Sequence, residues 1–435
     1  MSDTAIGFAG LGLLLVLIGL RFPIGVSLIG VSFGGIWLLI GERAAWGALG
    51  VVPWGFASTW QLSSIPMFLM MGFLCYHADL TAGLFRAARV FLSWLPGGLA
   101  VASVFGASGF AAVTGSSVAC AAAMGKIAVP EMMRARYDVA LATGTVAAAG
   151  TIGALIPPSI LMILYGIIAQ VPVSKLFLGG VGAGLLTLAG YCTVIVLRSA
   201  VNPALAPRDA TRFGWSERLA ALGETWPVIL LILGVFGGLF AGVFTPTEAG
   251  AVGSALALLI GLAKRSLTWA GLRESVIDTL MNSAALFVIA IGASMLTRFL
   301  AYSGAGDALA EALSGATSRP VLLIAGIACV YLLLGMFLEP IGAMLLTLPI
   351  LLPIVGEAGF DLIWFGILLT KFLEIGMITP PVGLNVFVIK GVVGNLASTG
   401  TIFRGILWFL VADFLIVALL VALPDIVLWL PTRME

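Results

Sequence analysis

The sequence predicts an all-α polytopic membrane protein, built as an inverted repeat in which each half holds five membrane spans and one re-entrant hairpin. Of the 435 residues, 61% are hydrophobic and only 9% are charged, against about 25% charged in an ordinary soluble domain. Ten apolar segments are candidate spans, and the same helix-breaking residues recur in both halves. The composition and the net charge of +1 exclude a water-soluble enzyme, a disordered chain and a nucleic-acid binder.

The candidate spans follow from the length that a helix needs, about 20 apolar residues, to cross the hydrocarbon core. They are residues 5–20, 22–40, 57–78, 138–169, 175–197, 226–243, 246–263, 277–301, 361–390 and 402–424. Two of them, 138–169 and 361–390, are too long for one span, and a Pro-Pro pair interrupts each. Two further stretches, 97–127 and 320–355, contain glycine, proline or polar residues in mid-run, which is typical of re-entrant hairpins.

The two halves share the positions of their helix breaks. One fixed shift places Pro130 on Pro353 and aligns the segment 151–159 with the segment 374–382 without a gap. Proline breaks helices at fixed places because it lacks an N–H group and its ring clashes with the preceding turn. Since each half holds an odd number of spans, the second half crosses the membrane upside down. Such an inverted-topology repeat is typical of secondary transporters.

The longest polar connection, 198–225, divides the chain into a first repeat, 1–197, and a second repeat, 226–435. When the ten spans are threaded with the N-terminus outside, most of the 21 Lys and Arg residues fall on the same side of the membrane as this connection. Basic loops favour the cytoplasmic side. We therefore expect 198–225 to be cytoplasmic and both chain ends to lie outside. A missed span near 45–57 would move the N-terminus to the cytoplasm.

Each half carries two interruptions of the helical pattern that suit the binding of a ligand, a hairpin tip and a broken helix. The tips are Thr114–Ser117 and Leu338–Pro340, and the breaks are Gly150–Ser159 and Glu374–Asn385. Proline frees a carbonyl one turn earlier and glycine lets the chain unwind. Unwound backbone at membrane depth is tolerated only where protein or a water-filled cavity satisfies it. Ordinary proline kinks are the alternative interpretation, and the matched pairing of tips and breaks favours functional sites.

Freed carbonyls and hydroxyls suit Na⁺, and the N–H groups that begin each second half-helix suit a carboxylate. One Na⁺ is expected between the first tip and the first break, and another between the second tip and the second break. The expected Na⁺ ligands are Ser116, Ser117, Gly150, Gly153, Pro157, Gly335, Glu339, Gly376 and Thr379. The expected substrate-binding residues are Ser159, Gly383 and Asn385. No catalytic residue, no other metal and no other cofactor is expected.

Several charged residues lie inside apolar segments, where charges are costly and usually have partners or functions. Lys371 and Glu374 are three residues apart on one helix, so they are expected to neutralise each other. Glu339 is expected at a solvated turn near the outer water, and Arg298 to extend from its span end towards the interface. Asp413 lies in the middle of the last span, and the sequence assigns it no role.

Four motifs occur along the chain: Thr114-Gly-Ser-Ser-Val-Ala, Gly150-Thr-Ile-Gly153 through Ile156-Pro-Pro-Ser159, Phe244-Thr-Pro-Thr-Glu-Ala249 and Thr379-Pro-Pro-Val-Gly-Leu-Asn-Val-Phe387. Together they resemble the large membrane subunit (M subunit, DctM-like) of TRAP (tripartite ATP-independent periplasmic) transporters, over essentially the whole chain. Many members of this family are expected to have an uncharged stretch at the position of Lys371, so this lysine departs from the family pattern.

The resemblance implies Na⁺-driven uptake of an organic acid across a bacterial inner membrane. It also implies a periplasmic substrate-binding protein that hands over the substrate, and a small four-helix membrane subunit as a partner. No small subunit precedes residue 1, so this partner is expected to be a separate chain. The implied mechanism is of the elevator type, in which the hairpins and broken helices move against a scaffold of the remaining spans.

Two other functions remain as alternatives. A stand-alone divalent-anion/Na⁺ symporter of elevator type would need no partner, but its tips would usually carry Ser-Asn-Thr, whereas here they carry Thr-Gly-Ser-Ser and Leu-Glu-Pro. A membrane-embedded enzyme is disfavoured because the spans contain no His/Asp/Glu metal cluster and no Ser/His pair. An ATP-driven pump is excluded because the sequence lacks a Walker-type phosphate-binding loop.

Overall fold

The computed structural model describes residues 2–207, 213–312 and 320–434, and within these ranges the regular structure is helical, with no β-strand. Six of the described helices are long and apolar enough to cross a membrane, or eight if each of two bent helix pairs is one span. These findings confirm the predicted all-α polytopic class. The ten predicted spans also include the shorter helices Asp3–Gly19 and Ile24–Ile40 and the halves of the two broken helices.

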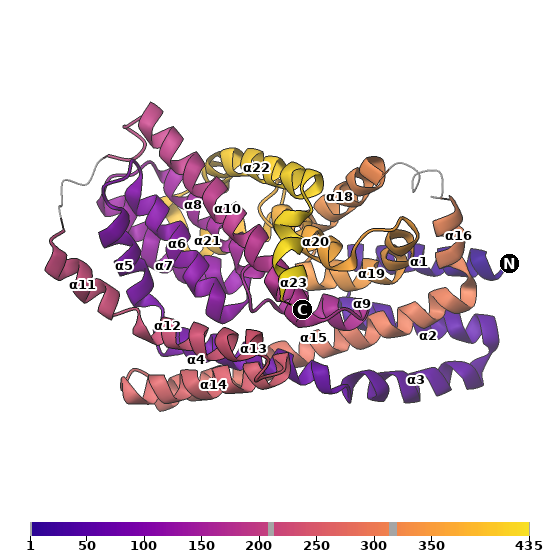
Figure 1. Cartoon of the computed structure of the whole chain (residues 1–435). Helices are drawn as coiled ribbons and strands as arrows, with labels where there is room; N and C mark the ends of the chain where they lie inside the picture. The colour runs from indigo at the N-terminus through magenta and orange to yellow at the C-terminus, as the bar shows by residue number, and fades with distance from the viewer. Residues whose placement is uncertain (1, 208–212, 313–319, 435) are drawn as a thin grey trace.

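A layer of long helices, here called the base layer, forms one side of the elongated molecule (Figure 1). α15 packs along α2 and α4, and α14 packs along α4. The base layer consists of α2 (Ile24–Ile40), α3 (Glu42–Ala57), α4 (Ser64–His77), α14 (Pro246–Ala263) and α15 (Trp269–Ser303). α15 has 35 residues. At 1.5 Å per residue it is about 52 Å long, so it extends well beyond the predicted span 277–301.

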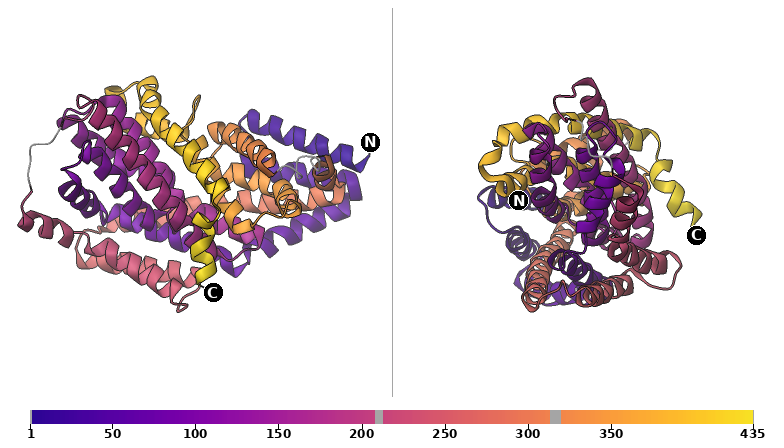
Figure 2. Two further views of the ribbon diagram at one scale, coloured as in Figure 1. Left: turned by 45° about the horizontal axis from the view of Figure 1, so that its top comes forward. Right: turned by 90° about the vertical axis from the view of Figure 1, so that its left-hand side faces the viewer.

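The second body, here called the hairpin domain, contains both helical hairpins and both broken helices (Figure 2). Its first half is α6 (Gly98–Thr114), α7 (Ser117–Arg134), α8 (Val139–Gly150), the 3₁₀ turn η2 (Thr151–Ala154) and α9 (Ile160–Ala169). Its second half is α18 (Pro320–Phe337), α19 (Pro340–Glu357), α20 (Leu362–Gly376) and α21 (Leu384–Val393). Three helices pack around this domain: α10 (Val173–Val201), α22 (Thr399–Ala422) and α23 (Asp425–Arg433).

The helix starts of the hairpin domain repeat their capping chemistry between the two halves. Asp138 caps α8 because its Oδ1 accepts from the backbone N–H of Leu141 at 2.9 Å. Asp361, the repeat mate of Asp138, caps α20 in the same way and accepts from Trp364 N–H at 2.9 Å. An N-cap carboxylate satisfies backbone donors that have no partner inside the helix. The shared sequence positions therefore begin matching helices in both halves.

Several helices were not predicted from hydropathy. They are α3, α5 (Ala82–Leu92), α11 (Trp215–Gly223), α16 (Ala305–Ala312) and α23, together with the short 3₁₀ turn η4 (Gly394–Leu396). The 3₁₀ turn η1 (Trp60–Ser63) lies inside the predicted span 57–78. α1 (Asp3–Gly19) fits the first predicted span. In place of one continuous helix over 226–243, the chain forms α12 (Trp226–Ile232), a π-helical turn over Leu233–Gly237 and α13 (Gly238–Phe240). Within the connection 198–225, residues 208–212 lie outside the described residues.

Candidate ion and substrate site

The first hairpin tip lies directly on the first helix break. Gly115 at the tip has φ +63°, and a Cβ atom there would lie 2.3 Å from the carbonyl oxygen of Pro158. At the break, a Cβ atom on Gly153 would lie 3.0 Å from the carbonyl oxygen of Ser116. Glycine is required at Gly115 because its left-handed backbone and the close approach both exclude a side chain. The structure thus brings together the first tip and the first break.

The second hairpin packs on the second break through a pair of glycines. A Cβ atom on Gly376 would lie 2.7 Å from the Cα of Gly335, so α18 and α20 cross at close range. The tip residue Glu339 caps α19 and accepts from Gly342 N–H at 3.4 Å. Thr379 Oγ1 donates to the Ile375 carbonyl at 2.6 Å, so this hydroxyl is bonded within its own turn.

A small cavity of about 60 Å³ lies where the two tips and the two breaks meet. Ser117 Oγ donates to Glu374 Oε1 at 2.6 Å across this junction. Of the expected ion ligands, the cavity gathers Ser116, Ser117 and Glu339. It is lined by Gly115, Ser116, Ser117, Val118, Ala154, Ile160, Leu161, Glu339, Pro340, Ile341, Glu374 and Met377. The sequence prediction did not include Glu374 as a site residue.

Glu374 was missed because the sequence pairs it with Lys371, and this pairing is wrong. Lys371 Nζ lies 2.5 Å from Asp413 Oδ1, and both side chains are fully buried. Tyr191 OH donates to the same carboxylate at 2.9 Å and lies 3.0 Å from Thr151 Oγ1. Lys371 therefore extends across to α22 rather than along its own helix. The lone charge of Asp413 inside the last span was the available signal, since a buried charge needs a partner.

A larger cavity of about 550 Å³ separates the hairpin domain from the base layer. Thr114, Ser116 and Glu339 contribute its polar surface on the hairpin side. Ile160 and Leu384, the first residues of α9 and α21, also line it. Both half-helices thus begin at this cavity, where helix N-termini favour negative charge. The opposite wall consists of residues from α4 and α15.

The expected substrate residues lie beside this cavity, and none of the three is among the residues that line it. Ser159 is fully buried and caps α9 by accepting from Met162 N–H at 3.3 Å. Gly383 has φ +62° and precedes Leu384 at the start of α21. Asn385 is fully buried, and its Nδ2 donates to the carbonyl of Ala147 at 3.5 Å, towards α8.

The remaining expected Na⁺ ligands to be placed are Gly150, Pro157 and Glu339. Gly150 packs against α7, where a Cβ atom would lie 2.8 Å from Ala121 Cβ, and Pro157 is buried next to Pro158. Glu339 was expected at a solvated turn. It is exposed there, as expected, and it also lines both the small and the large cavity. At the start of α19, Glu339 lines the small cavity together with residues of the first tip.

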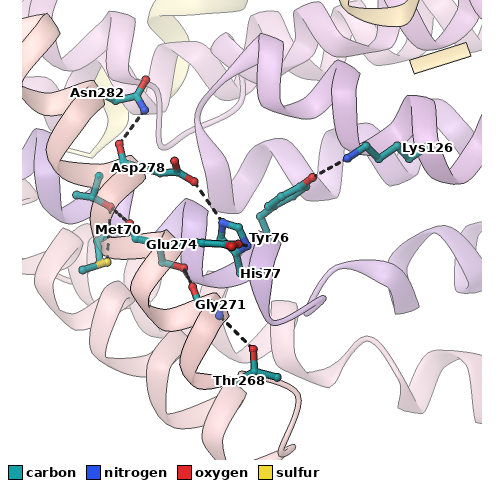
Figure 3. A network of polar contacts seen from close by, with 11 residues as sticks. Met70, Tyr76, His77, Lys126, Thr268, Gly271, Glu274, Asp278 and Asn282 are labelled. Carbon is teal, nitrogen blue, oxygen red and sulfur yellow. Dashed lines mark hydrogen bonds and ion pairs between the residues drawn. The ribbon is translucent and has the colours of Figure 1, made fainter. Parts of the chain in front are cut away.

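The base-layer wall of the large cavity carries a polar network (Figure 3). His77 on α4 lies 3.3 Å from Asp278 and 3.5 Å from Glu274, both on α15. Tyr76 accepts from Lys126 Nζ of α7 at 3.2 Å, which joins the base layer to the hairpin domain. The contacts of His77 with Asp278 and Glu274 link α4 to α15, so the wall that faces the tips belongs to the base layer.

Two hairpin tips and two broken helices that meet at a cavity against a separate helix layer define a multi-pass membrane transport protein. The family described as "Tripartite ATP-independent periplasmic transporter, DctM component" matches residues 11–426. The chain belongs to this family. It is a large permease subunit of a TRAP transporter, which confirms the resemblance seen in the motifs.

Two relatives agree with this assignment, and a solved structure shares the fold. The chain is 32% identical to the C4-dicarboxylate TRAP transporter large permease protein DctM of Vibrio cholerae, over 87% of each chain. It is 29% identical to the sialic acid TRAP transporter large permease protein SiaM of the same species, over 98% of this chain and 97% of the relative. The fold is similar to the crystal structure of the YdaH transporter of Alcanivorax borkumensis, with TM-score 0.62, 15% identity and coverage of 89% of this chain and 91% of that one.

Family membership decides among the functions that the sequence left open. TRAP large permeases are transport proteins, so the chain is not an enzyme. They work with a small membrane subunit and a periplasmic substrate-binding protein, which excludes the stand-alone symporter. The chain is therefore a multi-pass membrane component of a multi-subunit transporter.

Proposed function

We propose that this chain is the translocating subunit of a Na⁺-coupled secondary transporter that imports an organic acid through a bacterial inner membrane. A periplasmic binding protein delivers the acid, and a separate small four-helix subunit completes the membrane complex. The hairpin domain moves as an elevator against the base layer. The chain ends lie in the periplasm and the connection 198–225 lies in the cytoplasm.

The convergence of both tips and both half-helix starts on one cavity supports this function most strongly. The first tip reaches it through Ser116 and the second through Glu339, while α9 and α21 begin at its edge. These elements come from the two halves of the sequence, so they meet only when both repeats fold against each other. A cavity of this size accommodates a small organic acid, since ligand sites of this kind measure roughly 300–1,000 Å³.

Na⁺ binds at two sites in this proposal, one for each pairing of a tip with a break. At the first, Ser116 and Ser117 face the backbone of Gly150, Gly153 and Pro157. At the second, Gly335 and Glu339 face Gly376 and Thr379. Hard oxygen ligands suit Na⁺, and unwound backbone carbonyls with half-helix ends are typical Na⁺ ligands in broken-helix transporters. The close contact of each tip with its break supports both sites.

The substrate carboxylate binds at the N-terminal ends of α9 and α21, with Ser159, Gly383 and Asn385 shaping these starts. Backbone N–H groups and the positive end of the helix dipole compensate its charge. The relatives' named substrates, a C4-dicarboxylate and sialic acid, are carboxylic acids, which supports an organic acid here. Because Asn385 points towards α8, it acts by holding the first turn of α21 in place.

Uptake into proteoliposomes tests the coupling ion. The complex of both membrane subunits, supplied with its loaded binding protein, is expected to accumulate substrate only with an inward Na⁺ gradient. Ser117→Ala and Thr379→Ala are expected to raise the Na⁺ concentration for half-maximal uptake severalfold, because each removes a hydroxyl next to a proposed site. Full uptake driven by a proton gradient in the absence of Na⁺ would refute Na⁺ coupling.

A further inference from the structure

One carboxylate oxygen at the junction of the tips has no partner. Glu374 is fully buried, and its Oε1 accepts from Ser117 Oγ at 2.6 Å. Its Oε2 is also buried and makes no hydrogen bond to the residues that the structure describes. A buried carboxylate that is neither paired nor fully hydrogen-bonded carries a large desolvation cost. This cost indicates that a ligand completes the site.

Among the described residues, no cation makes a direct ion pair with Glu374. Lys371 is the nearest cation along the helix, but its Nζ is engaged by Asp413 at 2.5 Å, with Tyr191 completing the carboxylate's hydrogen bonds. Three ionisable side chains are therefore buried together, one positive and two negative. Since the Lys371–Asp413 pair is closed, the negative charge of Glu374 remains for another cation.

There is room for a cation beside Glu374. The small cavity measures about 60 Å³, whereas a single water-sized species needs roughly 10–15 Å³ of the same kind of volume. Ser117 at the first tip and Glu339 at the second tip add oxygen atoms to its lining. The cavity thus brings together Glu374, whose Oε2 has no partner, the Ser117 hydroxyl and a second carboxylate, that of the exposed Glu339.

We propose that Glu374 is the charged ligand of a Na⁺ site that joins the two repeats, with Ser117 from the first tip and Glu339 from the second tip. This inference rests on the proposed Na⁺ coupling. It differs from the two sites between a tip and its own break, because its ligands come from both halves. Bound Na⁺ would hold both tips on the second break.

The ligand set favours Na⁺ over divalent metals. Ca²⁺ takes six to eight oxygen ligands, more than the side chains of this cavity supply. No group of three or more His, Cys, Asp or Glu side chains that could hold a metal occurs among the described residues.

Thermal unfolding of the purified complex of both membrane subunits tests the site without transport. The melting temperature is measured in KCl, NaCl and CaCl₂ at equal ionic strength for the wild type, Glu374→Gln and the matched control Glu357→Gln. Glu357 ends α19 and is exposed. We expect NaCl to stabilise the wild type and Glu357→Gln by several degrees. Glu374→Gln is expected to be more stable than the wild type in KCl, because it removes an uncompensated charge. It is also expected to lose part of the NaCl effect, the remainder coming from the two sites between each tip and its own break.

Glu374→Asp keeps the charge but shortens the side chain, so it provides a second measure if Glu374→Gln does not accumulate. Its NaCl stabilisation is expected to need about tenfold more Na⁺. An equal NaCl effect in Glu374→Gln and the wild type, together with Na⁺-dependent uptake, would overturn this site and leave Na⁺ coupling intact. A wild type that responds to Na⁺ in neither stability nor uptake would overturn both, and stabilisation by CaCl₂ alone would overturn the choice of Na⁺.

Discussion

At the scale of single residues, the Lys371–Asp413 pair is the main structural charge interaction inside the hairpin domain. It joins α20 to α22, and Tyr191 extends it to Thr151 at the first break. A buried ion pair of this kind contributes little net stability when intact, because desolvation offsets the attraction. Losing one partner is costly, since the other charge remains buried alone.

Lys371→Ala is therefore expected to destabilise the complex by about 3–5 kcal/mol, the cost of an uncompensated buried charge. The double variant Lys371→Met/Asp413→Leu is expected to recover most of that loss, because it removes both charges and keeps the volume. Urea or thermal unfolding of the purified complex measures both effects. Lys264→Ala is the matched control, since Lys264 is exposed at the end of α14. A Lys371→Ala variant as stable as the wild type would contradict the role of the pair.

The sequence predicted which residues lie at the tips and breaks, but not which neighbours their side chains face. Spacing along a helix places Lys371 and Glu374 one turn apart, which allows a contact between them. Each instead points to a different helix, Lys371 to α22 and Glu374 to the first tip. Asn385 likewise faces α8. Such directions depend on how helices from distant segments pack, and a single sequence does not contain that information.

At the scale of elements, matched prolines and glycines predicted the hairpins and broken helices well, whereas several amphipathic helices escaped prediction. α5 buries Phe85 and Val90 on one face and carries Arg86 on the other, so its mean hydropathy is low. α15 continues beyond the predicted span because its first turns, which include Glu274, remain helical while they face polar neighbours. Hydropathy detects apolar length, and helices that are apolar on one side fall below its threshold.

The helix α3 bears on the orientation of the chain. It has 16 residues, and unlike α1 and α2, which are about as short, it is not among the helices apolar enough to be candidate membrane segments. We therefore do not count it as a span, which keeps the N-terminus outside and the connection 198–225 inside. A cysteine at Asn202, an exposed position at the start of this connection, is expected to react with a membrane-impermeant maleimide only after cells are permeabilised.

A cysteine at the exposed Trp60 is the matched control, expected to react in intact cells because it lies at the outer end of α4. The exposed native Cys329 is first replaced by serine to remove background labelling. Efficient labelling of Asn202→Cys from outside, with Trp60→Cys protected, would reverse the proposed topology.

At the scale of the whole molecule, the base layer and the hairpin domain pack together around the large cavity, with α15 against α19 and α4 against α6. One close contact joins α4 to the first tip: a Cβ atom on Gly72 would lie 3.5 Å from Thr114 Cβ. An elevator requires that this contact breaks, because the tip must travel along the base layer while α4 stays in place. The same distance falls within the range of disulfide Cβ–Cβ separations, roughly 3.5–4.5 Å.

Gly72→Cys/Thr114→Cys, with the native cysteines replaced by alanine, is therefore expected to form a disulfide under mild oxidation and to stop uptake. Reduction is expected to restore uptake to the level of the Gly72→Cys single variant, which shows what the tight contact of the new Cβ with the Thr114 backbone, at 3.1 Å from its Cα, costs by itself. Gly261→Cys/Ala78→Cys is the control pair: its Cβ atoms would lie 3.2 Å apart within the base layer, slightly closer than the range of disulfide separations, so α4 and α14 must separate a little to form the bond. A disulfide within the base layer should leave uptake unchanged. Undiminished uptake by the oxidised Gly72→Cys/Thr114→Cys protein would show that the hairpin domain does not slide along the base layer, because a covalent bond between the two bodies is incompatible with that movement.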